Sequence, residues 1–261
     1  MRHFNLLLWA NLVVFICSAQ NNQGGRLTAM GATGAAVKDL WGVAANPANI
    51  VGHPTPSLQI TYQLNAISKD LSTQALAFVF PINKQAIGIH TQRYGMAEYQ
   101  SNSIALILAK EFGPKLSLGI RGTYHQLRIS GYGSTTAASI DVGIAYQLSD
   151  RVMLGYFLNN PSRSDYIANS AISIPTVGHL GISLQASDKL LLSGRINKEN
   201  FALGFDYQLV SIFSIRSGIS LSPLTHYFGI GLVHNKFIVD LTYLKNSQFT
   251  HTPQLSFGYA F

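Results

Sequence analysis

Charged residues are scarce in this sequence of 261 residues. Asp, Glu, Lys and Arg together make up 11% of the chain, against roughly 25% in an ordinary soluble domain. Hydrophobic residues reach 47%, so a soluble protein of this composition would lack the charged groups that normally cover a surface. The composition therefore favours a protein whose surface faces lipid.

Long hydrophobic runs are also missing beyond residue 20. A membrane-spanning helix needs about 20 predominantly apolar residues in succession. The apolar residues of this chain instead recur at every second position within many short segments. Because only helices and closed barrels satisfy their backbone polar groups in lipid, the pattern predicts a transmembrane β-barrel.

The N-terminus has the features of an export signal. Two basic residues at 2–3 precede an apolar stretch at 6–16, and small residues occupy 17–19. We expect a signal peptide over residues 1–19, followed by a mature chain that begins at Gln20. The alternative is a lipoprotein signal with an acylated Cys17, but Ile16 occupies a position where such signals usually carry a small residue.

Cysteine is absent once this segment has been removed, because Cys17 is the only one in the sequence. Disulfides, thiol nucleophiles and cysteine-ligated metals are then excluded. No motif for a metal, phosphate or other cofactor occurs, so we expect neither a metal nor a cofactor. Histidine and serine show no catalytic spacing, and acidic pairs are lacking. The sequence therefore predicts a protein that is not an enzyme.

The net charge of +7 does not indicate a nucleic-acid binder. A nucleic-acid-binding face would gather Lys and Arg with aromatic residues between them. Here the basic residues are scattered, and several fall in predicted turns. We expect no nucleic-acid partner, and anionic lipid headgroups or surface glycolipid are better candidates for these residues.

Short alternating segments fill the chain from residue 56 to residue 261. They predict an all-β, antiparallel, up-and-down barrel of about 14 strands in the outer membrane of a Gram-negative bacterium. Twelve strands are the alternative, if the weak segments at 74–92 and 190–209 pair differently. Residues 159–175 form the one long interruption, a candidate extracellular loop. The expected strands are 57–64, 74–82, 85–92, 102–110, 115–128, 138–148, 151–158, 176–185, 190–197, 201–209, 212–220, 226–233, 237–244 and 254–261.

The two faces of these segments differ in kind. One face carries bulky apolar side chains, and the other carries Gly, Ala, Ser, Gln and isolated charges. A soluble sandwich would need a second face rich in Lys, Glu and Thr. We therefore expect the bulky face to meet lipid and the slim face to enclose a narrow polar lumen. The expectation fails if the following bulky residues pack in a central core: Leu118, Ile144, Phe205 and Val239.

Eight polar residues on the slim face are candidates for a polar network in the lumen. Unpaired buried charges are costly, so we expect Asp141 to pair with Arg121, and Asp206 to pair with Arg195 or Arg216. A network that fills the lumen structurally is favoured over a constriction that contacts a plug or solute. The full set is Arg121, His125, Asp141, His179, Arg195, Asp206, Arg216 and Asp240.

The last strand ends on an aromatic residue. Phe257, Tyr259 and Phe261 alternate with small residues, a pattern that resembles the signal by which the outer-membrane assembly machinery engages its clients. The alternative is an edge strand of a soluble protein, but an uncharged aromatic edge is an aggregation hazard. We expect the assembly machinery and outer-membrane lipid as partners.

Residues 20–55 differ from the rest of the chain and are rich in Gly, Ala and Asn. Asn46 suits an N-cap and Pro47 the first helical position, so a short helix is expected to begin there. The glycines allow close approach to a barrel wall, and Trp41 would anchor the segment. We expect a plug inside the barrel; the alternative is a flexible periplasmic tail.

A motif runs through this segment, formed by Arg26, Met30, Gly31, Gly34, Ala36, Asp39, Trp41, Asn46, Pro47 and Ala48. With this motif the segment resembles the N-terminus of the PorV/PorQ-type proteins, relatives of the FadL fatty-acid transporter family. Lys38 stands where an acidic residue is common in that family, and Asn49 replaces a frequent Gly. The resemblance implies a fourteen-stranded barrel with a plug, although this chain is shorter than the well-known members.

Two functions follow from the resemblance. The first is an accessory barrel that docks a translocon or a secreted protein, as relatives in type IX secretion do. The second is a FadL-like transporter of small hydrophobic molecules, which predicts an apolar pocket around the plug and a lateral opening between strands. The docking function is the primary hypothesis at this point.

Overall fold

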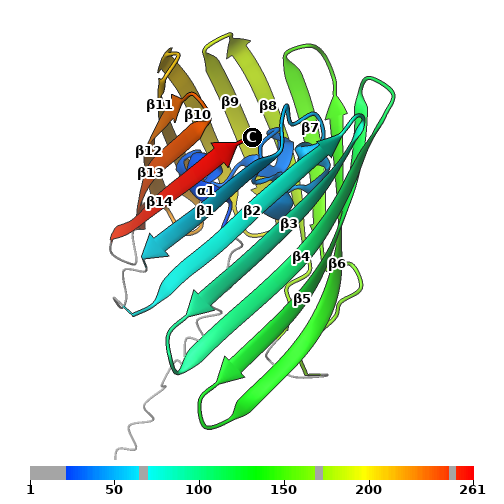
Figure 1. Cartoon of the computed structure of the whole chain (residues 1–261), viewed down its shortest axis with the longest axis vertical. Coiled ribbons are helices and arrows are strands. Elements are labelled where there is room, and N and C mark those ends of the chain that lie inside the picture. The colour runs from blue at the N-terminus through cyan, green and yellow to red at the C-terminus, as the bar shows by residue number, and fades with distance from the viewer. Residues whose placement is uncertain (1–21, 65–69, 168–172, 247–250) are drawn as a thin grey trace, which may run out of the picture.

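The computed structural model describes residues 22–64, 70–167, 173–246 and 251–261. The predicted signal peptide and Cys17 lie outside these residues. Fourteen antiparallel strands form a closed barrel (Figure 1). They are β1 (Ser57–Leu64), β2 (Ser72–Ile82), β3 (Gln85–Gly95), β4 (Tyr99–Phe112), β5 (Leu116–Ile129), β6 (Gly133–Gln147), β7 (Val152–Asn159), β8 (Val177–Ser187), β9 (Leu190–Asn197), β10 (Phe201–Val210), β11 (Phe213–Leu221), β12 (Thr225–His234), β13 (Phe237–Asn246) and β14 (His251–Ala260).

The predicted topology is confirmed, with fourteen strands and not twelve. Each strand pairs with its neighbours in sequence, and β1 pairs with β14 to close the barrel. Closure leaves no unpaired first or last strand, which removes the edges that a flat sheet would expose. All fourteen expected segments overlap an observed strand.

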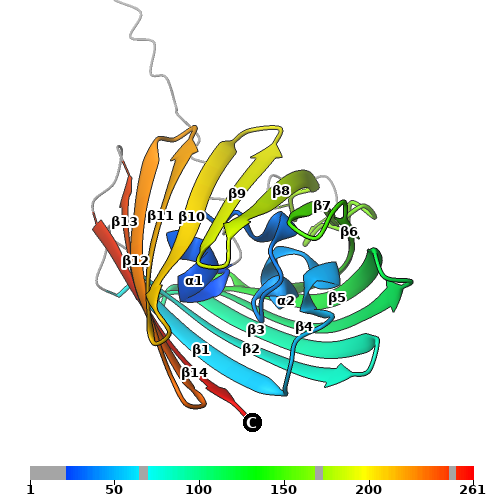
Figure 2. The same ribbon diagram turned by 90° about the horizontal axis from the view of Figure 1, so that it is seen from above.

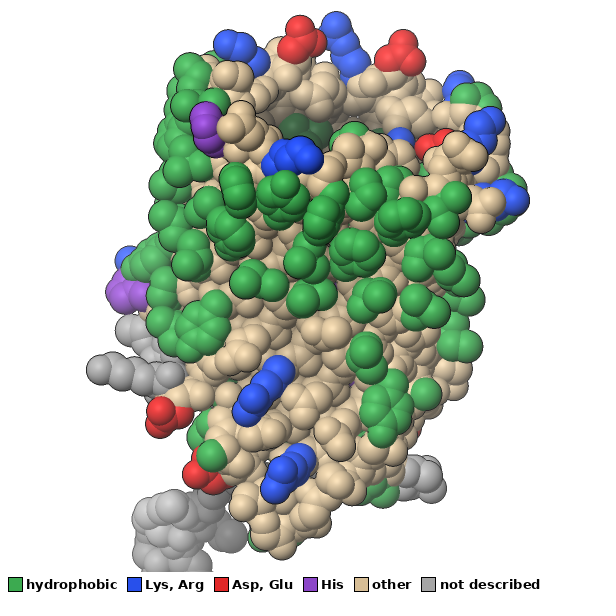
Figure 3. Space-filling view, in the orientation of Figure 1, with side chains coloured by type: hydrophobic (Ala, Val, Ile, Leu, Met, Phe, Trp, Pro, Cys, Tyr) green, Lys and Arg blue, Asp and Glu red, His purple; other side chains and the backbone are tan. Residues whose placement is uncertain are grey.

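The bulky side chains point outward, as the alternation predicts. Leu118 and Ile144 are 37% and 42% exposed, and Phe205 and Val239 lie on the same outward face of their strands as Leu203 and Leu241, which are 47% and 48% exposed. Figure 3 shows the apolar side chains as a belt across the face of the wall in view. Such a belt is the surface of a barrel embedded in lipid.

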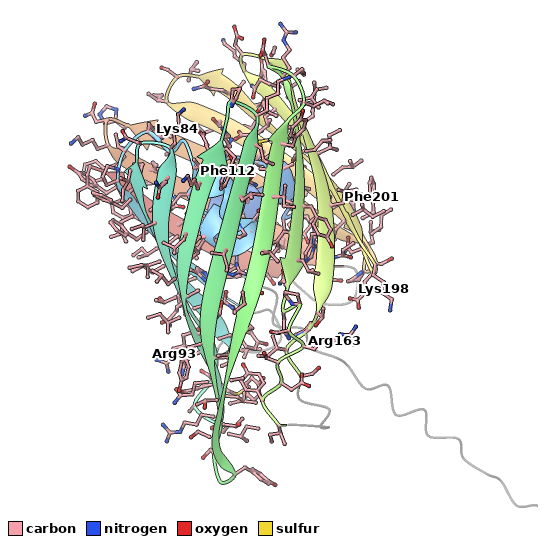
Figure 4. The ribbon with its side chains drawn as sticks, turned by 90° about the vertical axis from the view of Figure 1, so that its right-hand side faces the viewer. Lys84, Arg93, Phe112, Arg163, Lys198 and Phe201 are labelled. Carbon is pink, nitrogen blue, oxygen red and sulfur yellow. The ribbon has the colours of Figure 1, made fainter. Side chains whose placement is uncertain are left out.

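The two ends of the barrel differ. The C-terminal end carries the C-terminus and tight turns such as the one between β2 and β3. The opposite end, called here the distal end, carries the β7–β8 connection of residues 160–176. Lys84 and Phe112 lie near the first end, and Arg93 and Arg163 lie toward the second (Figure 4).

Strands β3 to β6 form a panel that extends beyond the rest of the wall at the distal end (Figure 1). Strands β4, β5 and β6 have 14, 14 and 15 residues, whereas β7 has 8. Strand β6 pairs with β7 only over residues 142–147. Among the described residues, no strand pairs with 133–141 of β6 on the β7 side, so these residues are a free edge. The Thr135 hydroxyl on this edge donates to the Tyr166 carbonyl of the 160–176 connection.

The N-terminal segment lies inside the barrel, in the half nearer the C-terminal end (Figures 1 and 2). Residues 22–56 thus form a plug and not a tail. Among the described residues, no helix is long and apolar enough to cross a membrane. The plug contains two short α-helices, α1 (Gly24–Ala29) and α2 (Gly42–Ala45), and two 3-10 helices, η1 (Gly34–Ala36) and η2 (Pro47–Ile50).

The short helix expected near Asn46 is η2. The Asn46 side chain accepts a hydrogen bond from the Ala48 backbone N–H at 3.1 Å, and Pro47 occupies the first helical position. Asn46 Nδ2 also donates to the carbonyl oxygens of Ala35, at 2.7 Å, and of Ile144 on β6, at 3.1 Å. One buried amide therefore caps a helix, folds the plug and attaches it to the wall.

Candidate functional site: the plugged lumen

One side of the plug is apolar. Trp41, Val43 and Ile50 are fully buried, and the inner face of β2–β4 that receives them is also apolar, with residues such as Val79 and Ile107. The expected narrow polar lumen is therefore wrong for this part of the wall. The inner side chains there are apolar because they face the plug and not water.

Trp41 is the central side chain of this apolar side. Its indole N–H donates to the Gln59 side chain on β1. Its ring meets the edge of His90 on β3, with the ring centroids 6.1 Å apart. The buried indole thus has both a hydrogen-bond partner and an apolar setting, which explains its place in the plug motif.

Glycines on the inner wall allow the plug backbone to touch the strands. A Cβ on Gly155 would lie 1.9 Å from the carbonyl oxygen of Ala35, and one on Gly204 would lie 2.1 Å from that of Met30. Glycine is the residue that permits such close approach of two backbones. We call the whole set the seat glycines: Gly119, Gly143, Gly155, Gly181, Gly204, Gly218 and Gly229.

The other side of the plug is held by ion pairs with β10, β11 and β13. Arg26 Nε lies 2.7 Å from Asp206 Oδ2, and Arg26 Nη1 lies 2.8 Å from Asp39 Oδ2. Arg216 bridges Asp206, at 3.1 Å, and Asp240. Two arginines and three aspartates therefore form one network, in which each charge has an opposite partner, as burial requires.

A second ion pair connects the plug with the distal connection. Arg121 Nε on β5 lies 2.7 Å from Asp141 Oδ2 on β6. Arg121 Nη1 donates to the carbonyl oxygens of Val43, at 2.9 Å, and Ala44, at 2.8 Å. Asp141 Oδ1 accepts from the backbone N–H of Asn160, at 2.8 Å. One pair on the wall therefore holds the plug on one side and the base of the 160–176 connection on the other.

Asn160 fixes the start of that connection. Its side-chain amide donates to the carbonyl oxygens of Ser164 and Ile174, and Thr176 donates to its backbone carbonyl. Farther along, Tyr166 lies edge-on to His125, with the ring centroids 6.1 Å apart. Burial raises the pKa of the Tyr166 hydroxyl, so this side chain stays neutral. Tyr166 thus brings this part of the connection against β5 and β6 of the panel.

Arg195 does not pair with Asp206, so that alternative is wrong. In the sheet, Arg195 stands opposite Ala202, whereas Asp206 stands opposite Arg216. Four residues separate Ala202 from Asp206, or about 13 Å along the strand. Arg195 Nη1 instead lies 3.2 Å from His179 Nδ1, and His179 stacks on Phe157. Within the described part of the chain, no carboxylate lies within 4 Å of Arg195.

His125 forms a contact that the sequence did not predict. Its Nε2 lies 2.8 Å from Ser139 Oγ on the neighbouring strand. A serine–histidine pair is half of a nucleophilic site, but it also needs a third group that orients the base. In the described residues, no carboxylate is bonded to this imidazole. No three His, Cys, Asp or Glu side chains among them gather where a metal ion could bind.

The remaining motif residues serve the plug itself. Gly31 has a φ of +74° that favours glycine, and it contacts β10 and β11. Gly34 packs against Ala45 and Leu27, while Pro47 and Ala48 contact Gly119 of the wall. In the sequence, Arg26 and Asp39 stand out only as members of this motif, whereas in the structure they complete the charge network of the wall.

The C-terminal aromatics form a separate cluster on the outside. Phe237 of β13 packs against Phe257 and Tyr259, and Tyr259 packs against Phe261, with ring centroids 5.1–5.9 Å apart. They belong to the lipid-facing surface and not to the lumen. Their role in assembly stays a prediction.

These features define a closed fourteen-stranded barrel with its own N-terminal plug. No protein-family model and no curated protein sequence matches the chain. Solved structures share the fold. The monoaromatic hydrocarbon channel CymD superposes with a TM-score of 0.70 at 15% identity, covering 92% of this chain and 98% of that one. The toluene transporter TbuX of Ralstonia pickettii gives 0.71 at 13% identity, covering 93% and 99%.

A third structure belongs to the same group by fold. The toluene transporter TodX of P. putida gives a TM-score of 0.67 at 12% identity, covering 93% of this chain and 99% of that one. A FadL homologue of Pseudomonas aeruginosa also superposes, at 0.62 and 12% identity. The chain therefore has the FadL-like barrel fold over almost its whole length.

Proposed function

We propose that this chain is a non-enzymatic outer-membrane channel that carries small hydrophobic molecules past its N-terminal plug. The observation that carries the proposal is a plugged barrel whose fold matches hydrocarbon channels and toluene transporters over more than 90% of the chain. The lipid-facing belt supports a membrane location. Short turns are typical of the periplasmic side, so the distal end would face outward.

The docking function in type IX secretion rests on the N-terminal motif alone. CymD, TbuX and TodX, which share the fold, are a channel and two transporters by name. Transport is therefore better supported than docking, and it becomes the primary hypothesis.

Two structural features support transport. The plug is attached by hydrogen bonds, ion pairs and packing, so it can move without breaking a covalent bond. In addition, the free edge of β6 begins at Asp141 and passes outward-facing Ile140 and Ala138. A solute above the plug could leave the lumen sideways at this edge, beside the 160–176 connection.

A disulfide between the plug and the wall, which can be reduced again, tests whether the plug must move during transport. A Cβ on Gly181 would lie 2.7 Å from the Cβ of Ala35, and disulfides have Cβ atoms about 3.8 Å apart. A shift of about 1 Å therefore allows a bond between cysteines in the A35C/G181C variant. We expect uptake of labelled toluene by cells to fall to the background of cells without the barrel after oxidation, and to recover after reduction.

The single variants A35C and G181C are the controls, because they carry the same thiols without the bond. Unchanged uptake in the oxidised double variant contradicts transport past a moving plug. Co-purification of a secreted protein with that same variant would then favour docking.

A further inference from the structure

The outer face of the panel changes character toward the distal end. Up to the row of Leu76, Thr91, Ile104, Tyr124 and Ala138, the outward side chains belong to the apolar belt. The next row is polar, and so is the one beyond it. Figure 3 shows this region as a polar wall below the belt, with isolated basic groups on it. In register, the two polar rows are Gln74, Arg93, Asn102, Gln126 and Thr136, then Ser72, Gly95, Gln100, Arg128 and Ser134.

These two rows contain two arginines and no acidic residue. Arg93 and Arg128 are both exposed. Among the described residues, no carboxylate lies within 4 Å of either guanidinium. Arg93 stands beside Asn102, and Arg128 stands beside Gln100, two residues farther along the same strand. Their Cα atoms are therefore about 12 Å apart, from two strand spacings and one two-residue step.

The two rows begin where the apolar belt ends. The strands of the panel are tilted (Figure 1), so a row that follows the strand register does not lie at one depth, and Arg128 lies farther from the belt than Arg93. Both arginines therefore stand outside the hydrocarbon, on the side where lipid headgroups and their sugars lie.

A hollow of about 600 Å³ lies directly beside Arg93 on the outer face. Its apolar side chains come from β1, β2 and β14, and Gln74, Arg93 and Asn102 form its polar rim. The hollow thus joins an apolar floor to a cationic and amide-bearing rim. An amphipathic molecule with an acyl chain and an anionic, hydroxyl-bearing head fits this division. The apolar lining includes Ile60, Tyr62, Leu76, Leu255 and Phe257.

We infer that the panel binds a bisphosphorylated glycolipid of the surrounding leaflet. One phosphate contacts Arg93 and the other contacts Arg128, because guanidinium groups bind phosphate oxygens with paired hydrogen bonds. The amide side chains between them hydrogen-bond the sugar hydroxyls. A lipid with a single phosphate reaches only one arginine at a time, since the two lie about 12 Å apart. The inference rests on the membrane location proposed above, but not on transport.

The test compares three lipids on the full chain in neutral detergent, with bound lipid counted by native mass spectrometry. We expect diphosphoryl lipid A to bind about tenfold more tightly than monophosphoryl lipid A, because one charge-assisted contact is lost. Phosphatidylglycerol, which carries one phosphate and no sugar ring, is expected to bind more weakly still.

Arginine variants locate the site. R93Q/R128Q is expected to bind diphosphoryl lipid A about tenfold or more weakly, while both exposed positions leave the fold intact. R163Q is the matched control, because Arg163 is an exposed arginine of the distal connection and lies away from Arg93 (Figure 4). Equal binding by R93Q/R128Q and the parent chain overturns the site. Equal binding of phosphatidylglycerol and diphosphoryl lipid A overturns the glycolipid assignment.

The lipid test and the uptake test can fail separately. Loss of lipid binding in R93Q/R128Q with normal toluene uptake supports this inference and leaves transport standing. Normal lipid binding in R93Q/R128Q overturns this inference, whatever the A35C/G181C disulfide shows.

Discussion

The Gly155→Val variant is expected to form a closed barrel that has released its plug. A Cβ at Gly155 would lie 1.9 Å from the carbonyl oxygen and 2.6 Å from the carbonyl carbon of Ala35. Both are backbone atoms, so no side-chain rotation relieves the contact. Strand β7 is fixed by its pairing with β6 and β8, so the plug must yield.

The effect of Gly155→Val on the attachment of the plug should be large. Overpacking commonly costs about 1–3 kcal/mol and sometimes more, and a backbone clash belongs at the upper end. A cost of about 3 kcal/mol raises the unplugged fraction roughly a hundredfold. We expect rapid proteolysis of the N-terminal segment in folded barrels, together with increased entry of polar antibiotics into cells.

Gly122→Val is the matched control. Gly122 also lies within a strand, β5, but it points outward and a Cβ there would meet nothing within 4 Å. Valine suits a strand at both positions, so only the contact with the plug distinguishes the two variants. If proteolysis of the plug is equally slow in both, the seat glycines do not hold the plug.

The second large effect is expected for Arg121→Leu. This change leaves the Asp141 carboxylate buried without its cation, since both side chains are at most 5% exposed. Removing one partner of a buried pair typically costs about 3–5 kcal/mol. It also removes both hydrogen bonds to the plug carbonyls of Val43 and Ala44. We expect a loss of this size in the free energy of unfolding, measured by urea titration in lipid vesicles.

Two further variants sharpen this result. Arg128→Leu removes an arginine from the same strand at an exposed position, and it should change the free energy of unfolding by less than about 0.5 kcal/mol. The double variant R121L/D141L should recover part of the loss, because no charge is left unpaired. A loss for R121L no larger than that for R128L contradicts a structural role for the pair.

The fold could be predicted from sequence because alternation is a local signal. Each strand in the lipid-facing belt places a bulky apolar side chain at every second residue. The strand and its outward face can therefore be predicted from its own residues, without knowing which strands pair with it. The alternation of apolar and small residues is lost where strands β3 to β6 extend beyond the apolar belt. Residues 133–137 of β6 read Gly-Ser-Thr-Thr-Ala and look like a turn, yet they continue the strand because β5 pairs with them throughout.

The site could be predicted only in part, because contacts with the plug are not local. The pairing of Arg121 with Asp141 follows from one strand neighbouring the next. The contact of Arg26 with Asp206 joins residues 180 positions apart, and no period in the sequence encodes it. The seat glycines look like slim lumen residues in sequence, and only the folded plug shows that each one meets a residue of the plug.

The burial of Trp41 has a spectroscopic consequence. The sequence contains two tryptophans, Trp9 and Trp41, and Trp9 falls in the predicted signal peptide. A processed chain would therefore carry one indole, fully buried in the plug between Gln59 and His90. Its tryptophan emission would report the plug alone, because the fourteen strands around it contain no tryptophan. A red shift would mark the moment when water reaches the segment, in a protein without any added dye.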